Sequence, residues 1–367
     1  MPGTETLTRS ATRKPRSFYD VTGPVGLWLH EGVAPERGTE SLSLSIQYKK
    51  YRSVENDTAG YEEEGCPEIS QRGDLMKLFL SDSARHLRQN IRKHGLEIGQ
   101  YESYAFADGE RGYRLREDVR GESFVLIASV LPNPESLFEI LAFHRLACEN
   151  GARHTVFLVP YLGYARQDRP GGPGEGSIGS MVLESLQKMN PSKLILFDVH
   201  SDLIRKAFRP FVTELSALSL IANALARHPP DVIVSPDAGF VSRAAKLQKL
   251  LEPKPSLAVI EKVRPRRNVA IAKHLHGDVR RKDVLIVDDM IDTGGTLSEA
   301  VKLVSENGAH NIRLAATHGI FSRDARERLI RLPIKEVLIT NTLPQTRSPR
   351  IRTLDISPLV VDALAGI

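Results

Sequence analysis

The sequence predicts an α/β protein built from two domains, with mainly parallel sheets flanked by helices. Short, almost continuous apolar runs alternate with segments of helical apolar spacing from residue 76 onward. The runs are rich in Val, Ile, Leu and Phe, which is typical of strands buried on both faces of a parallel sheet. The alternation passes through two stretches of similar length, residues 76–214 and 215–367. We therefore predict one domain for each stretch.

The first stretch carries the elements of one α/β domain. Mostly apolar runs predict strands at 77–80, 123–129, 154–159 and 193–198. Apolar residues at helical spacing predict helices at 84–94, 135–150 and 178–189. Gly95 and Gly151 follow two of these helices, and glycine is common just after the last helical residue.

The second stretch repeats the same alternation. Its apolar runs predict strands at 232–235, 257–260, 284–289 and 312–317. Its helical spacing predicts helices at 216–227, 241–251 and 296–307. Ligands of parallel sheets bind beyond the carboxyl ends of the strands. The polar residues that follow these runs are therefore the candidates for a functional site.

Residues 1–75 lack this alternation. Met1–Arg16 is rich in Thr, Ser and Arg, and residues 60–67 are acidic and turn-like. Only residues 42–46 alternate as a short strand would. We expect an N-terminal extension that is disordered or loosely packed. It contains no hydrophobic segment of the kind found in a secretory signal.

The composition is that of a globular protein and excludes several classes. The 367 residues are 41% hydrophobic and 26% charged, close to ordinary globular usage. No apolar run reaches the roughly 18 to 20 residues that cross a bilayer, so no membrane partner is expected. Cys66 and Cys148 are the two cysteines, which excludes a disulfide scaffold and favours a reducing compartment. We therefore expect a cytoplasmic protein.

The charge is unevenly distributed along the chain. Residues 1–75 carry 9 basic and 12 acidic side chains, whereas residues 76–367 carry 41 basic and 33 acidic ones. A basic body attracts nucleic acid or small phosphorylated metabolites. The basic residues form no single long stripe, and no aromatic-interleaved RNA-binding motif occurs. Small anions are therefore favoured as ligands, and nucleic acid is not expected as a partner.

The segment 284–297 carries the strongest chemical signal. An apolar strand ends in Asp288 and Asp289, and a loop of small residues then opens a helix. The backbone N–H groups and hydroxyls of residues 293–296, with the positive end of the helix, suit a phosphate. The two carboxylates suit sugar hydroxyls, so the segment predicts a ribose 5-phosphate site. A purely structural interpretation, in which Asp292 or Thr293 caps the helix and the glycines form a turn, leaves the paired acids unexplained.

This segment resembles the ribose-phosphate fingerprint of the type I phosphoribosyltransferase superfamily. Further segments resemble those of one branch, the ribose-phosphate diphosphokinases, over residues 76–361. They are Ala105-Phe-Ala-Asp-Gly-Glu, Pro160-Tyr-Leu-Gly-Tyr-Ala-Arg-Gln-Asp-Arg, Phe197-Asp-Val-His-Ser, Val234-Ser-Pro-Asp-Ala-Gly and Glu261-Lys-Val-Arg-Pro-Arg-Arg-Asn with Gly277-Asp-Val. The resemblance implies two phosphoribosyltransferase-like domains. It also implies transfer of the diphosphoryl group of MgATP to the C1 hydroxyl of ribose 5-phosphate, which leaves AMP.

The resemblance assigns a role to each matching residue. Lys262 and Arg264 match the two catalytic cations of a flexible loop, which stabilise charge on the transferring group. His200 and Asp237 match the positions associated with Mg²⁺. The residues that match ATP contacts are Phe106, Asp108, Glu110, Arg166, Gln167 and Asp168. The ribose 5-phosphate set is Asp288, Asp289, Asp292, Thr293, Gly294, Gly295 and Thr296.

The loop that carries Phe106 comes from a neighbouring subunit in the family. The resemblance therefore implies a homo-oligomer with a composite active site. The chain also departs from the family pattern. Phe240 replaces a usual glycine near Asp237, and residues 170–177 lack the usual basic residues. Asp118 stands where the phosphate-activated members carry a serine, which favours a chain whose activity does not depend on phosphate.

Two other functions stay open at this stage. A phosphoribosyltransferase would use the same ribose-phosphate fingerprint, but it has no need of the 166–168 triplet or of Lys262 and Arg264. A catalytically silent regulatory relative of the synthetase is the second alternative. Phe240 and the Gly-rich loop favour it, whereas Lys262, Arg264, His200 and Asp237 favour an active enzyme.

Overall fold

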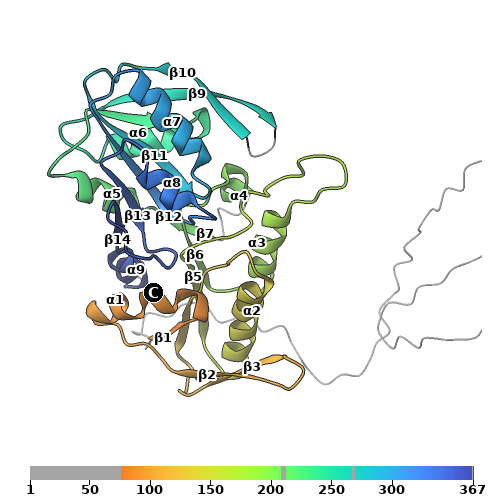
Figure 1. Ribbon diagram of the computed structural model, residues 1–367. Helices are drawn as coiled ribbons and strands as arrows, with labels where there is room; N and C mark the ends of the chain where they lie inside the picture. Colours follow the sequence, from red (N-terminus) through yellow and green to blue (C-terminus); the bar gives the residue numbers. More distant parts are fainter. Residues whose placement is uncertain (1–75, 208–211, 267–268, 366) are drawn as a thin grey trace, which may run out of the picture. The chain divides into compact units, whose positions relative to one another are not determined.

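The structure is a computed structural model that describes residues 76–207, 212–266, 269–365 and 367, with side chains not described for residues 262–273. The expected extension and the possible strand at 42–46 lie outside the described residues. The described residues belong to one compact unit, which contains two large sheets and a two-stranded hairpin (Figure 1). In the described part of the chain, no helix is long and apolar enough to span a bilayer.

The first sheet is entirely parallel, with strand order β1-β4-β5-β6-β7. Its strands are β1 (Met76–Leu80), β4 (Ser123–Ile127), β5 (His154–Val159), β6 (Lys193–Phe197) and β7 (Val212–Leu215). Strands β4 and β5 are buried along their whole length, which explains why their sequences are apolar on both alternating faces. A separate antiparallel hairpin consists of β2 (Tyr101–Ala105) and β3 (Arg111–Leu115).

Helices cover both faces of this sheet. On one face, α2 (Pro134–Glu149) and α3 (Ile178–Lys188) pack on side chains such as Phe124 and Phe157. On the other face, Leu78, Val125 and Ile195 form a core with three short helices. These are the 3₁₀ helix η1 (Asp82–Leu87), α1 (Arg88–Lys93) and the C-terminal α9 (Ser357–Leu364). The last helix of the chain therefore packs on the first sheet.

The second sheet has seven strands in the order β10-β9-β8-β11-β12-β13-β14, all parallel to their neighbours except the edge strand β10. Their bounds are β8 (Val232–Ser235), β9 (Ser256–Arg266), β10 (Val269–His276), β11 (Asp283–Ile291), β12 (Asn311–Gly319), β13 (Glu336–Thr340) and β14 (Ile351–Leu354). The predicted mainly parallel α/β fold is confirmed. The division of the chain into two domains at residue 215 stays a prediction.

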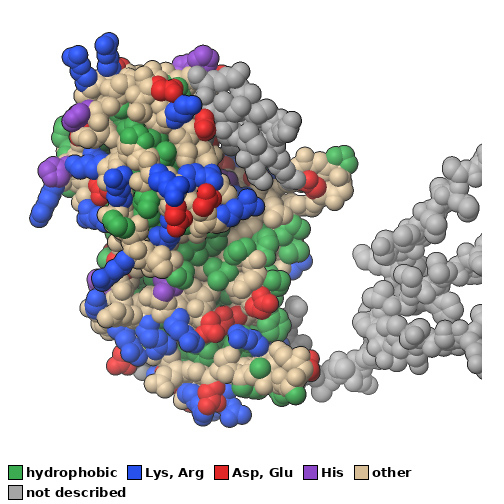
Figure 2. All heavy atoms as spheres, in the orientation of Figure 1, with side chains coloured by type: hydrophobic (Ala, Val, Ile, Leu, Met, Phe, Trp, Pro, Cys, Tyr) green, Lys and Arg blue, Asp and Glu red, His purple; other side chains and the backbone are tan. Residues whose placement is uncertain are grey.

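Helices also cover both faces of the second sheet. α7 (Gly295–Glu306) and α8 (Ala325–Ile330) pack on the face that contains Ile286 and Leu314. α5 (Leu218–Leu225) and α6 (Val241–Gln248) pack on the opposite face, with Leu285 and Ala315. Two further short elements are α4 (Asp202–Ala207) and η2 (Ala238–Phe240). Figure 2 shows Lys and Arg side chains on one face of the molecule in several groups with Asp and Glu among them.

One segment differs from the sequence-based expectation. Residues 261–266 were predicted to leave a strand and form a loop, but the backbone continues β9 to Arg266 and pairs with β10. The pairing is irregular, with register shifts between Val269 and Ile271 and between Ala272 and His274.

Candidate functional site

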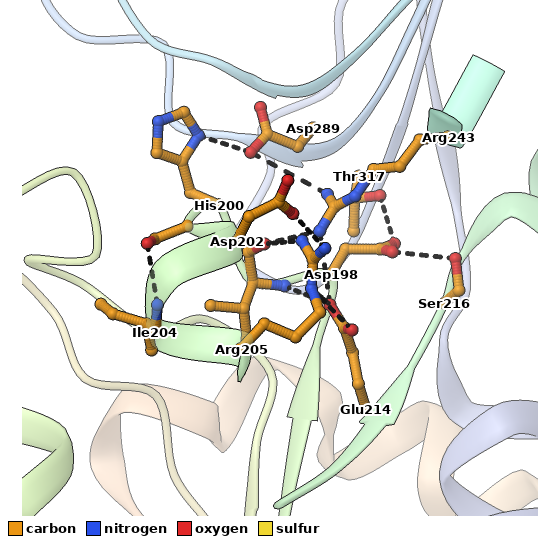
Figure 3. A network of polar contacts seen from close by, with 12 residues as sticks. Asp198, His200, Asp202, Ile204, Arg205, Glu214, Ser216, Arg243, Asp289 and Thr317 are labelled. Carbon is orange, nitrogen blue, oxygen red and sulfur yellow. Dashed lines mark hydrogen bonds and ion pairs between the residues drawn. The ribbon is translucent and has the colours of Figure 1, made fainter. Parts of the chain in front are cut away.

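The site forms where the carboxyl ends of β6 and β11 approach each other. The His200 Nδ1 atom, after β6, lies 2.6 Å from Oδ2 of Asp289 on β11, as Figure 3 shows. Two residues that are 89 positions apart in the sequence thus form one hydrogen bond. The segments predicted to bind the metal and the ribose phosphate therefore lie together.

The β11–α7 loop has the geometry of an anion cradle. Gly294 adopts a φ of 73°, a left-handed conformation that favours glycine, and it directly precedes α7. The first N–H groups of a helix have no partner within that helix, and they point toward its N-terminal end. Thr293 is exposed and Thr296 is half-buried at this end. A phosphate placed there would meet backbone N–H groups, hydroxyls and the positive end of α7.

The adjacent acids of β11 have different environments. Successive side chains of a strand point to opposite faces. By register, Asp288 follows Ile286 on the α7 face and Asp289 follows Val287 on the α6 face. Burial and the neighbouring Asp289 carboxylate raise the pKa of Asp288 well above its usual range. Asp288 therefore lies on the same face as the phosphate cradle.

Asp289 is held in its ionised form by its contacts with His200 and Arg243. Burial alone would raise its pKa, but the hydrogen bond and charge of His200 and the charge of Arg243 lower it to about 2. The Arg243 Nη1 atom lies 4.0 Å from Asp289 Oδ2. Burial of the His200 imidazole lowers its pKa, but the hydrogen bond and the charge of Asp289 raise it. The net effect is a raised pKa for His200.

Arg243 is a central residue of the site that the sequence interpretation missed. It is 9% exposed and lies on the buried face of α6 beside Ala244 and Leu247. Its Nη2 atom donates to the Val199 carbonyl at 2.5 Å and lies 3.3 Å from Glu214 Oε1. A charged residue at a core position of an amphipathic helix was the available signal, since such residues are seldom buried without partners.

Asp198 forms a second buried connection between the sheets. It is 4% exposed, follows β6 and adopts a φ of 34°, which is uncommon for a non-glycine residue. Its Oδ2 atom accepts from the Thr317 hydroxyl at 2.7 Å and from the Ala217 N–H at 2.8 Å, and Oδ1 accepts from Ser216 at 2.8 Å (Figure 3). The bond to Thr317 joins the carboxyl end of β6 in the first sheet to that of β12 in the second sheet.

Two residues of the predicted ATP-binding triplet, Arg166 and Asp168, contact residues of this site. Arg166 forms an ion pair with Asp292 of the β11–α7 loop, across 126 positions of sequence. The second oxygen of Asp292, Oδ1, is buried and has no hydrogen-bond partner among the described residues. Asp168 Oδ2 accepts from the Ser201 hydroxyl at 2.8 Å, next to His200. Arg166 is half-exposed and so presents its remaining donors to a ligand.

Gly179 explains how this segment is held. Its N–H donates to the Gln167 carbonyl at 3.0 Å, at the start of α3. A Cβ at this position would lie 2.7 Å from the Tyr164 carbonyl and 3.2 Å from that of Gln167. Only glycine lets α3 approach the backbone so closely. Gln167 is thereby fixed by its backbone, while its side chain is exposed.

The predicted base-binding residues lie at the exposed tip of the β2–β3 hairpin. Phe106 is 56% exposed and packs edge-on against Tyr104, with ring centroids 5.5 Å apart. Asp108 accepts a hydrogen bond from the Glu110 N–H at 3.1 Å. Among the described residues, no hydrogen bond or ion pair joins this tip to the predicted ribose-phosphate loop.

The two predicted catalytic cations lie on β9. Lys262 pairs with Ala272 of β10 in the backbone register. The side chains of Lys262 and Arg264 are outside the described part. Their strand, β9, is the neighbour of β8, and Asp237 follows the end of β8.

Asp237 lies at the start of η2, and its environment accommodates the unusual Phe240. Its Oδ1 atom accepts from the Phe240 N–H at 3.2 Å and caps the short helix. The Phe240 ring is 6% exposed and packs in the core beneath α5 and α6. The Arg243 guanidinium carbon lies 5.8 Å from the centre of this ring. Phe240 thus supports Arg243 from the core side.

The donor set at the predicted metal positions fits Mg²⁺ only in a partly hydrated form. Where the chain is described, no three His, Cys, Asp or Glu side chains are grouped so as to hold a metal. Mg²⁺ is commonly bound through one or two carboxylates, with water and substrate phosphates as its other ligands. The Asp237 carboxylate suits this role. His200 keeps its Nε2 side available because Nδ1 faces Asp289.

Comparisons with known proteins agree with this arrangement. Residues 76–189 match the N-terminal domain of ribose phosphate pyrophosphokinase, and residues 242–367 match the phosphoribosyl synthetase-associated domain. A ribose-phosphate pyrophosphokinase of Caldanaerobacter subterraneus subsp. tengcongensis is 35% identical over 80% of this chain and 94% of that protein. One from Lactococcus lactis is 35% identical over 80% of this chain and 93% of that protein.

A solved structure gives the same result. The phosphoribosylpyrophosphate synthetase from Mycobacterium smegmatis superimposes with a TM-score of 0.71 at 31% sequence identity. The match covers 79% of this chain and 98% of that protein. The match in sequence and the match in structure extend over nearly the whole length of these relatives. The chain belongs to the ribose-phosphate pyrophosphokinase family.

Proposed function

We propose that the chain transfers the diphosphoryl group of MgATP to the C1 hydroxyl of ribose 5-phosphate, giving 5-phosphoribosyl 1-diphosphate and AMP for nucleotide biosynthesis. The hydroxyl oxygen attacks the β-phosphorus, the bond from that phosphorus to the α,β-bridging oxygen breaks, and the hydroxyl proton is released. The contacts of Asp292 with Arg166 and of Asp289 with His200 carry the proposal. They join the two expected substrate segments at one place.

The residues divide the work of positioning. The 5-phosphate is held at the start of α7, by Thr293, Gly294, Gly295 and Thr296. Asp288 and Asp292 accept hydrogen bonds from ribose hydroxyls. Arg166 lies beside the ribose-phosphate loop and donates to ATP phosphates. Holding two substrates in line supplies much of the rate enhancement in phosphoryl transfer.

Magnesium and the catalytic cations complete the electrostatics. Bound Mg²⁺, held through Asp237 and His200, would neutralise charge on the ATP phosphates. Lys262 and Arg264 provide positive charge to the transferring group. Arg243 acts on Asp289 and not on substrate, since it is buried between Asp289 and Glu214. It is thus a positioning residue.

The reaction itself is tested by AMP release. Purified protein is incubated with MgATP and ribose 5-phosphate, with no nucleobase present. AMP and phosphoribosyl diphosphate should form in equal amounts. A phosphoribosyltransferase would release no AMP, and a silent relative would bind both substrates without turnover. Either of those results overturns the proposal.

We also propose a cytoplasmic homo-oligomer whose active site is shared between subunits. The exposed Phe106 and the carboxylates at 108 and 110 support this, because no hydrogen bond or ion pair among the described residues joins the tip of the separate β2–β3 hairpin to the ribose-phosphate loop. Analytical ultracentrifugation measures the assembly. A monomer that turns over at full rate would contradict a shared site.

Variants of the ribose-phosphate loop should weaken one substrate selectively. Thr296→Val removes a hydroxyl donor, and Asp288→Asn replaces a carboxyl group that lies on the α7 face of β11. We expect the Kd of ribose 5-phosphate to rise about tenfold for each, the effect of losing one hydrogen bond to a charged group. The Kd of ATP should change far less. Calorimetric titration of each substrate measures this, and a selective loss of ATP binding would mean that the loop is misassigned.

A chain that begins at Met76 should fold and turn over almost as well as the full chain. β1 begins at Met76, and Leu78 and Leu80 lie in the core of the first sheet. Every proposed site residue lies after this strand. We expect the thermal midpoint and kcat of the two chains to agree closely. Loss of solubility or of turnover would show that residues 1–75 contribute to the active assembly.

Inorganic phosphate should not be required for activity. Asp118 stands where phosphate-activated members of the family carry a serine; its carboxylate is exposed and accepts a hydrogen bond from the Arg120 N–H at 3.0 Å. Like charges repel, and residues 170–176 supply no compensating cation. Kinetics in a phosphate-free buffer should give full turnover, with ADP competing against ATP. ADP inhibition that saturating ATP fails to relieve would indicate a regulatory site.

A further inference from the structure

A cavity of about 360 Å³ lies at the opposite edge of the second sheet from the proposed active site. The active site is at the carboxyl ends of the strands, whereas this cavity is at the amino ends of β12, β13 and β14. Its lining is Ala224, His228, Arg313, Lys335, Glu336, Pro349, Arg350, Ile351 and Arg352. The proposed reaction uses none of these residues.

The most informative residue of this cavity is Arg313. It is two positions before Ala315 on β12, so it lies on the face that α5 and α6 cover. Arg313 is 4% exposed, and burial lowers its pKa. Its Nη1 atom donates to the His228 carbonyl at 2.7 Å. Its Nη2 atom is buried and has no acceptor among the described residues.

A buried guanidinium with an unused donor is costly unless a ligand or counterion completes it. The carboxylates that act on Arg313 are Glu336, Asp283 and Asp231, but none forms an ion pair with it in the described structure. Asp283 is engaged instead by His310 and Asn311. Asp231 accepts from the Asp283 N–H. Arg313 therefore keeps unsatisfied hydrogen-bonding capacity.

The other cations of the lining lack acidic partners too. Arg350 donates to the carbonyls of Ile330 and Leu332 at 2.9 and 3.5 Å. Lys335 and Arg352 are exposed, and neither forms an ion pair within the described ranges. The cavity is thus lined by four cationic side chains and a single carboxylate, that of Glu336. Solvent screens three of these charges, so exposure alone explains them, but it does not explain Arg313.

We propose that this cavity binds a phosphate group, either as free inorganic phosphate or as part of a nucleotide. Guanidinium groups match the oxygens of a phosphate with two parallel donors, and a lysine adds a compact charge. A phosphate dianion would offset part of the positive charge of the four cations, and its oxygens would accept hydrogen bonds from the unused Nη2 donor of Arg313. The volume lies within the range of small-molecule sites, which leaves room for more than the phosphate itself.

The test is calorimetric titration of inorganic phosphate into the full chain, with ribose 5-phosphate saturating so that the α7 cradle is filled. The Lys335→Gln/Arg352→Gln double variant removes two exposed lining charges whose side chains form no hydrogen bond or ion pair in the described structure. Lys249→Gln/Arg92→Gln removes the same charge at exposed positions outside the cavity. Circular dichroism melting verifies that both fold. Arg313→Met is a third variant, which probes the buried fork directly.

We expect the cavity double variant to weaken phosphate binding at least about tenfold and the matched control less than about twofold. AMP titrated in parallel distinguishes free phosphate from a nucleotide phosphate. If the cavity double variant weakens the binding of phosphate but not of AMP, the ligand is the free ion. If it weakens the binding of both, the cavity also accepts the phosphate of a nucleotide. Equal affinities in the two double variants would overturn the proposal, as would no phosphate binding by the unsubstituted chain. The comparison of double variants does not depend on the proposed enzymatic activity.

Discussion

Lys262→Ala and Arg264→Ala should each lower kcat by about two to three decades, the usual loss when one strong charge-stabilising donor is removed. The transferring diphosphoryl group carries negative charge that develops in the transition state, and both residues match the family's catalytic cations. They lie on β9, the strand next to β8, which leads to Asp237. The Kd of ribose 5-phosphate should change little, because in the proposed site its phosphate lies at the start of α7 and not on β9.

Two substitutions make this expectation specific. Lys262→Arg keeps the charge but changes its geometry, so its kcat should lie between those of the alanine variant and the unsubstituted chain. Lys249→Ala removes an exposed lysine at the end of α6, outside the proposed site, and should leave kcat unchanged. Single-turnover kinetics separates the chemical step from product release. Near-normal turnover in both alanine variants would remove Lys262 and Arg264 from the mechanism.

The parts of the fold that could be predicted are those in which burial dictates the residue type. β4 and β5 are buried throughout, so their apolar runs identify them directly. The short strands β7 and β14 have half-exposed and exposed positions, and no apolar run marks them. Residues 257–260 of β9 were predicted as a strand, but residues 261–266 were expected to form a loop, since their Arg- and Pro-rich sequence resembles one. Strand pairing there depends on a tertiary neighbour and not on local preference.

The candidate site shows the same limit. The β11–α7 loop is contiguous in sequence, so its acids, glycines and threonines can be recognised together. The contacts of Asp289 with His200 and of Asp292 with Arg166 cross 89 and 126 positions. The local sequence around each residue does not indicate which distant residue will lie beside it in the fold. Arg243 was missed because its role exists only once β6, β11 and α6 have assembled around it.

Arg243→Met should lower the free energy of unfolding by about 3 to 5 kcal/mol, the usual result of removing one partner from a buried ion pair. Methionine fills much of the space of the arginine stem but supplies no charge. The Asp289 and Glu214 side chains, 6% and 25% exposed, would then lose a shared cation. The Val199 carbonyl would also lose its donor at 2.5 Å. Urea denaturation measures the change.

Arg205→Met is the matched control for this prediction. Arg205 also contacts Glu214 and donates to the Val199 carbonyl, but its side chain is 28% exposed, so solvent replaces more of what is lost. We expect a loss of about 1 kcal/mol for Arg205→Met. Arg243→Lys, which keeps the charge but not the two parallel guanidinium donors, should lose an amount between these two values.

Equal losses of unfolding free energy for Arg243→Met and Arg205→Met would mean that burial of the Asp289–Arg243–Glu214 contacts does not increase their contribution to stability. A difference of several kcal/mol would show that the junction between the sheets depends on this one guanidinium, and through Asp289 it would also perturb His200.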